Sequence, residues 1–110
     1  MAAFIKGDVV VVPFPFCDLS DAKRRPALVV ATMSGDDVVL CQITRQAKQD
    51  DWAIAIDGED LEGGSLKQSS NVRPNRLSTC DSGIILYRVG TLSEVKMRQV
   101  TQKIIDLFTA

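Results

Sequence analysis

The sequence contains no histidine, and this absence removes several kinds of catalytic site at once. Serine and cysteine nucleophiles of the Ser-His-Asp and Cys-His types need an imidazole base, so both are excluded. The three cysteines, Cys17, Cys41 and Cys80, are far apart and form no CxxC pair, which argues against a structural zinc site and a disulfide scaffold. Cys41 lies in an apolar run and is expected to be a small core residue.

Long apolar runs are also missing, because no stretch approaches the roughly 20 residues that a membrane-spanning helix needs. The opening residues MAAFIKGD reach a charge at Lys6 and lack the apolar core of a secretion signal. We therefore expect a cytoplasmic protein, and 110 residues fit a single domain over residues 1–110. A chain of this size buries little more than about 60% of its unfolded surface, which favours dimerisation.

No glycine-rich loop leads into a helix, so the common nucleotide-binding folds are not expected. Charge is segregated along the chain: residues 36–62 hold two basic and eight acidic side chains, whereas residues 63–110 hold seven basic and three acidic ones. The net charge of −1 argues against indiscriminate binding of nucleic acid, but this segregation allows one basic face. The ordered spacing of a calcium loop is absent from the acidic group Asp57, Glu59, Asp60 and Glu62.

Short β-branched runs separated by turn residues dominate most of the chain. They predict strands at Asp8–Phe14, Pro26–Thr32, Val38–Thr44, Trp52–Ile56, Ser69–Ser78 (with Pro74 as an interruption) and Ile84–Val89, and loops at 15–25 and 57–64. From Ser93 onward apolar residues recur three and four positions apart, which predicts a helix with Ser93 as its N-cap. This order indicates a mainly β fold, a strongly bent sheet or barrel with a helix packed against it.

The basic triplet Lys23-Arg24-Arg25 stands immediately before Pro26, at the predicted junction of loop and strand. Cations at such a junction can meet phosphate, and an arginine does so with a planar fork of several donors. Basic triplets are common on protein surfaces, so this motif indicates nucleic-acid binding only in combination with others.

That combination is present. The segments GDVVVVPFPF, RRPALVV and ITRQ, together with the later segment SSNVRPNRLSTCDSGIILYRVGTLS, are similar to the MazF/PemK family of toxins of type II toxin–antitoxin systems. The resemblance covers nearly the whole chain. It implies an SH3-like β-barrel of five to seven strands with a C-terminal helix, as in PemK, MazF and CcdB. It also implies a homodimer that binds a cognate antitoxin protein and cleaves single-stranded mRNA at specific sequences, without metal or other cofactor, to inhibit translation and growth.

The resemblance assigns catalysis to two residues, Arg25 before the proline and Thr44 at the end of the third strand. RNA can be cut by its own 2′-hydroxyl, so the protein must position the nucleotide and stabilise charge on the phosphoryl oxygens. Arg25 and Thr44 offer hydrogen-bond donors for this purpose. Asp18 and Asp21 are candidate bases, and both also fit turn formation. RNA contacts are expected from Phe16, Asp18, Ser20, Lys23, Arg24, Gln46 and, by a looser match, Arg76.

Two other functions fit the same predicted fold. One is a non-enzymatic, CcdB-like inhibitor of DNA gyrase, against which the pair Arg25 and Thr44 favours the nuclease. The other is an SH3-like interaction module, which the low aromatic content of 5% disfavours because a peptide groove needs aromatic side chains. Trp52 and Tyr87 could stack on bases, but core or dimer packing is the expected role of both.

Overall fold

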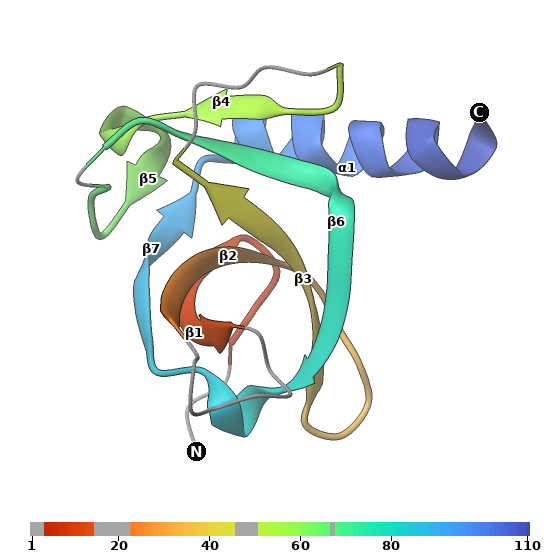
Figure 1. Cartoon of the computed structure of the whole chain (residues 1–110). Helices are drawn as coiled ribbons and strands as arrows, with labels where there is room; N and C mark the ends of the chain where they lie inside the picture. Colours follow the sequence, from red (N-terminus) through yellow and green to blue (C-terminus); the bar gives the residue numbers. More distant parts are fainter. Residues whose placement is uncertain (1–3, 15–22, 46–50, 67) are drawn as a thin grey trace.

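A computed structural model describes residues 4–14, 23–45, 51–66 and 68–110. These residues form a strongly curled antiparallel sheet with one C-terminal helix lying across it (Figure 1). The strand order is β4-β6-β3-β2-β1-β7-β5. The elements are β1 (Asp8–Phe14), β2 (Lys23–Thr32), β3 (Asp37–Thr44), β4 (Ile54–Ile56), β5 (Leu61–Glu62), β6 (Ser70–Asp81), β7 (Tyr87–Leu92) and α1 (Glu94–Thr109), with short 3-10 turns at Gly58–Asp60 and Ser82–Ile84. The predicted mainly β fold with a C-terminal helix is confirmed.

Alternation along the valine-rich strands gives the sheet two apolar faces. On one face Val9, Leu28 and Ile43 pack with Met97 and Val100 of α1, and we call this group the helix-side core. On the other face lies a second core made of Val10, Val12, Ala27, Val29, Val38, Leu40 and Cys80, with Phe4, Ile84 and Ile85 packed against it. Both faces of the central strands are therefore buried, which explains why four consecutive valines, Val9 to Val12, form an unbroken apolar run in β1.

Cys41 belongs to the helix-side core and is fully buried, as the sequence predicted. Burial raises the pKa of its thiol to about 12, so the group stays protonated and unreactive at neutral pH. The helix also begins where predicted, because the Ser93 hydroxyl accepts a hydrogen bond from the Lys96 N–H at 3.4 Å.

Several predicted boundaries were wrong. The strand predicted from Trp52 begins only at Ile54, and the strand predicted to end at Ser78 continues to Asp81. Lys23 to Arg25 are not loop residues, because they pair with Phe14 to Val12 and extend β2. The apolar residues Ile84 and Ile85 are not in a strand; they pack on the second core from a 3-10 turn capped by Asp81, and β7 starts only at Tyr87. The acidic loop at 57–64 contains a 3-10 turn and β5, and Asp57 and Asp60 form its capping box.

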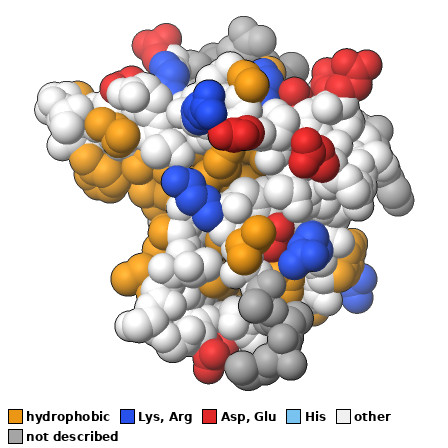
Figure 2. Space-filling view, turned by 180° about the vertical axis from the view of Figure 1, so that it is seen from behind, with side chains coloured by type: hydrophobic (Ala, Val, Ile, Leu, Met, Phe, Trp, Pro, Cys, Tyr) orange, Lys and Arg blue, Asp and Glu red, His pale blue; other side chains and the backbone are white. Residues whose placement is uncertain are grey.

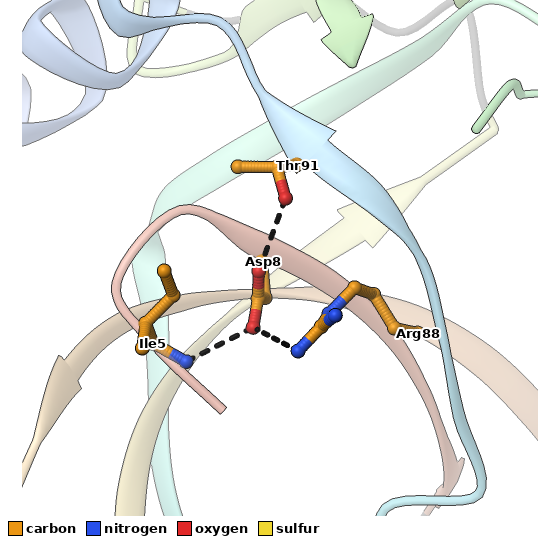
Figure 3. Close-up of polar contacts among 4 residues, drawn as sticks. All are labelled: Ile5, Asp8, Arg88 and Thr91. Carbon is orange, nitrogen blue, oxygen red and sulfur yellow. Dashed lines mark hydrogen bonds and ion pairs between the residues drawn. The ribbon is translucent and has the colours of Figure 1, made fainter. Parts of the chain in front are cut away.

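Asp8, only 1% exposed, ties the start of β1 to β7 (Figure 3). Its carboxylate accepts hydrogen bonds from the Ile5 N–H at 2.9 Å and the Thr91 hydroxyl at 3.2 Å. The same group forms an ion pair with Arg88 at 3.2 Å. Buried carboxylates are tolerated when several donors satisfy them, as they do here.

We expect Asp8→Ala to lower the free energy of unfolding by about 2–3 kcal/mol, because the substitution removes two hydrogen bonds and an ion pair made by a buried carboxylate. Glu94→Ala is the matched control, since Glu94 pairs with Arg98 at 2.6 Å on the exposed side of α1. Exposed pairs of this kind contribute less than about 1 kcal/mol. Urea unfolding of both variants checks the difference, and equal effects would show that the Asp8 contacts do not stabilise the fold.

Candidate active site at the open end of β2 and β3

Arg25 and Thr44 lie on the same face of the sheet. Ala27 on β2 pairs with Gln42 on β3, and this is the last pair between the two strands. Arg25 and Thr44 stand two residues beyond this pair, and because side chains alternate along a strand, they project from the same face as Ala27 and Gln42. Residues that face each other in an antiparallel pair project from the same side of the sheet. Two residues that lie far apart in sequence therefore lie on one face.

That face is the one that carries the second core. Arg25 pairs with Val12 on β1, and Val12 and Ala27 both belong to the second core. A small hollow between the core and the strand ends is lined by Val12, Phe14, Arg25, Pro26, Ala27, Leu40, Gln42 and Ser78. None of these lining residues is acidic, so the hollow combines apolar walls with a guanidinium and an amide.

β6 adds polar residues that the sequence did not single out. Thr44 pairs with Asn71, and Gln42 pairs with Arg73, so Asn71 and Arg73 project from the same face as Thr44. Asn71 is buried, at 7% exposure. Together with Arg25, these residues form a polar strip across three strands, which we call the Arg25–Thr44 face.

The interruption predicted at Pro74 explains how Arg76 reaches this face, in addition to Arg25 and Arg73. The register against β3 shifts at this point, so that Cys41 pairs with Leu77 and its neighbour Gln42 with Arg73. Residues 74–76 thus form a bulge, which is where a proline is tolerated in a sheet. From the bulge, the Arg76 guanidinium donates a long hydrogen bond of 3.5 Å to the Gln42 side-chain oxygen.

The side-chain hydroxyl of Thr44 is the group that most clearly indicates a ligand at this site. Its hydroxyl oxygen is buried and has no hydrogen-bond partner in the described part of the chain. An unsatisfied buried hydroxyl costs about 1–3 kcal/mol, and such groups are rare in folded proteins. An unpartnered donor beside an exposed guanidinium is well suited to an anionic ligand.

The remaining predicted RNA contacts have different positions. By alternation along β2, Lys23 projects from the same side as Arg25, whereas Arg24 projects from the opposite side. Arg76 lies beside Gln42, as described above. Phe16, Asp18, Ser20, Asp21 and Gln46 lie outside the described residues.

Gln42, Asn71 and Arg73 were missed by the sequence analysis. A signal for Gln42 was present, because it is the polar residue within the otherwise apolar run VVLCQI and stands two positions before Thr44. Residues two positions apart on a strand project from the same face of the sheet. No comparable local signal marks Asn71 and Arg73, which depend on pairing with β3.

The described residues contain no group of three or more histidine, cysteine or acidic side chains that could hold a metal ion. Among the same residues, no helix is long and apolar enough to cross a membrane.

The described residues thus combine a curled, mainly β sheet with one C-terminal helix. A family model described as the PemK-like, MazF-like toxin of type II toxin–antitoxin systems matches residues 5–108. The chain belongs to this family. The match agrees with the resemblance seen in the sequence and does not favour the CcdB-like alternative.

Solved structures share the fold at low sequence identity. MazF from Deinococcus radiodurans is 18% identical over 100% of both chains, with a TM-score of 0.75. A MazE-MazF structure from the same organism has a TM-score of 0.79, with 18% identity over 98% of each chain. An endoribonuclease from a mycobacterial species, in complex with its cognate antitoxin, has a TM-score of 0.73, with 15% identity over 99% of this chain and 96% of that one. No curated protein matches the chain.

Proposed function

We propose that this toxin is a metal-independent endoribonuclease that cleaves single-stranded mRNA in the cytoplasm and thereby inhibits translation. The observation that carries this proposal is the placement of Arg25 and the unpartnered Thr44 hydroxyl on one face. Family membership supports it, and so do the names of several structural neighbours, which are endoribonucleases.

The proposed chemistry uses the RNA itself as the nucleophile. The 2′-hydroxyl loses its proton and attacks the adjacent phosphorus, and the bond to the 5′-oxygen breaks. That oxygen takes up a proton and leaves as a 5′-hydroxyl, while the other fragment keeps a 2′,3′-cyclic phosphate. Negative charge develops on the non-bridging phosphoryl oxygens in the transition state, and this is the charge that the protein must stabilise.

Arg25 and Thr44 have complementary roles in this scheme. The Arg25 guanidinium donates to the phosphoryl oxygens and balances their charge. The Thr44 hydroxyl donates one further hydrogen bond, for which it has no competing partner in the described chain. Gln42 and Asn71 extend the donor surface beside them.

We further propose that the protein acts as a homodimer and binds a cognate antitoxin. Among the described residues, large apolar side chains are exposed at Ile5, at Met33 directly after β2, at Leu86 and Tyr87 where β7 begins, and at Val95, Ile105 and Phe108 on α1. In Figure 2, apolar side chains gather beneath the projecting end of the helix, beside a hollow in the surface. Exposed apolar patches on small domains mark protein interfaces. MazE-MazF complexes among the structural neighbours support an antitoxin partner.

Digestion of a long RNA in the presence of a chelator tests the nuclease proposal. Protein purified free of antitoxin is expected to cut at a few short sequences, leaving cyclic phosphates and 5′-hydroxyl ends. A parallel preparation of Arg25→Ala controls for contaminating nucleases. Intact RNA after exposure to the wild-type protein contradicts the proposal, and cleavage of supercoiled DNA only when gyrase is present would establish the CcdB-like alternative instead.

A further inference from the structure

A second basic site lies on the opposite side of the sheet from Arg25. Arg24 and Arg45 are the sequence neighbours of Arg25 and Thr44, and both line one groove. Because successive residues alternate between faces, both project away from the Arg25–Thr44 face. The end of the β2–β3 hairpin therefore presents a guanidinium and a hydroxyl on one side and two guanidinium groups on the other.

These two arginines line a groove of about 460 Å³. Its other lining residues are Val11, Pro26, Ser65, Leu66, Gln68, Ser70, Tyr87, Arg88 and Val89, so the described lining contains three arginines and no acidic residue. Tyr87 is 50% exposed and offers part of its ring to this space. Arg88 is held by Asp8, whose carboxylate neutralises its charge. The uncompensated positive charge therefore comes from Arg24 and Arg45.

Arg24 and Arg45 carry like charges into one groove. Two cations that line the same groove repel each other. Both side chains are exposed, and in the described part of the chain neither forms an ion pair with a carboxylate. A bound anion between them would relieve their repulsion and satisfy both guanidinium forks.

The wall of the groove beside β7 is formed where two backbone segments lie close together. A Cβ atom at Gly64 would lie 1.6 Å from the Val89 carbonyl oxygen, so this backbone approaches β7 as closely as only glycine allows. The Ser70 hydroxyl, which also lines the groove, donates to the Gln68 carbonyl at 3.1 Å.

We propose that this groove binds the single-stranded RNA that flanks the cleavage site, with phosphates between Arg24 and Arg45 and a base stacked on Tyr87. A cationic groove with an aromatic platform is the combination that binds single strands without reading their sequence. Pro26 lines both this groove and the hollow beside Arg25, so a strand leaving the Arg25–Thr44 face passes around the end of β2 into the groove. This inference rests on the proposed nuclease function and adds a subsite to it.

Equilibrium binding of a non-cleavable RNA, with a 2′-deoxy sugar at the cut position, tests the subsite separately from catalysis. A short oligonucleotide spanning the cut is compared with a longer one that carries flanking nucleotides. We expect the longer RNA to bind more tightly to the wild-type protein. Arg45→Ala and Tyr87→Leu are each expected to weaken binding of the longer RNA by about 5- to 100-fold, and so to reduce the advantage of length.

The dependence of RNA affinity on salt concentration separates the phosphate contact of Arg45 from base stacking on Tyr87. Each lost phosphate contact is expected to reduce the slope of log K against log salt by about 0.7, so Arg45→Ala changes the slope and Tyr87→Leu does not. Arg98→Ala on α1 removes the same charge far from the groove and is expected to behave as wild type. Thermal unfolding is expected to show Arg45→Ala at least as stable as wild type, because the repulsion with Arg24 is gone.

Unchanged affinity and slope for both groove variants, in a protein that still cleaves RNA, would overturn the subsite while leaving the nuclease intact. If the wild-type protein neither cleaves nor binds RNA, the proposed function itself fails. Loss of affinity for an acidic polyglutamate peptide, with RNA binding unchanged, would identify the groove as a peptide site and would also overturn the inference.

Discussion

Replacing Arg25 by alanine is expected to lower the rate of RNA cleavage by about 100- to 1,000-fold, which is the usual effect of removing one transition-state donor. The fold should remain intact. Arg25 is exposed, and its contribution to the sheet is backbone pairing with Val12, which alanine preserves. Single-turnover cleavage of an RNA with one cut site, together with a thermal unfolding curve, checks both parts of this expectation.

Two companion variants make the Arg25 result specific. Arg98→Ala removes an equal charge from the exposed side of α1 and should cleave at the wild-type rate. Arg25→Lys keeps the charge but loses the planar fork, so a rate between those of wild type and Arg25→Ala is expected. A folded Arg25→Ala protein that cleaves at the full rate would remove Arg25 from the mechanism.

Thr44→Val is expected to separate activity from stability. The substitution removes the hydroxyl that we place on the phosphoryl oxygens, so cleavage should fall by about 100-fold or more. The same hydroxyl is buried without a partner in the described chain, and its removal should raise the free energy of unfolding by about 1 kcal/mol. Valine also suits the strand position that Thr44 occupies at the end of β3.

Thr44→Ser is the matched control for this change, because it retains the hydroxyl and loses only a methyl group. It should keep most of the activity. A Thr44→Val protein that is both less stable and fully active would show that the hydroxyl has a structural role only.

Much of the fold could be predicted from the sequence because the relevant signals are local. The valine run gave β1, and the change to helical spacing after Ser93 gave α1. The wrong predictions concern segments whose secondary structure is determined by tertiary contacts and not by local sequence. Ile84 and Ile85 have the composition of a strand, yet they pack on the second core from a turn. Charge suggested a loop at Lys23–Arg25, but pairing with β1 holds these residues in β2.

The residues of the candidate site, too, could be predicted only in part from the sequence. Arg25 and Thr44 were predicted from a resemblance between whole segments, and alternation along the paired strands β2 and β3 puts both on one face. Asn71 and Arg73 were missed because only pairing with β3 brings β6 to this face. The groove beside Arg24 could not be predicted while the basic triplet was assigned to a loop, because only a strand sends adjacent side chains to opposite faces.

The central claim is that Arg25 and Thr44 act on one phosphoryl group as a unit, and a double-mutant cycle on the cleavage rate tests it most directly. Residues that act together are strongly non-additive. We predict that Arg25→Ala combined with Thr44→Val cleaves a single-site RNA little more slowly than the slower single variant. A double variant whose loss equals the product of the two single losses would contradict the account, because the two residues would then act independently.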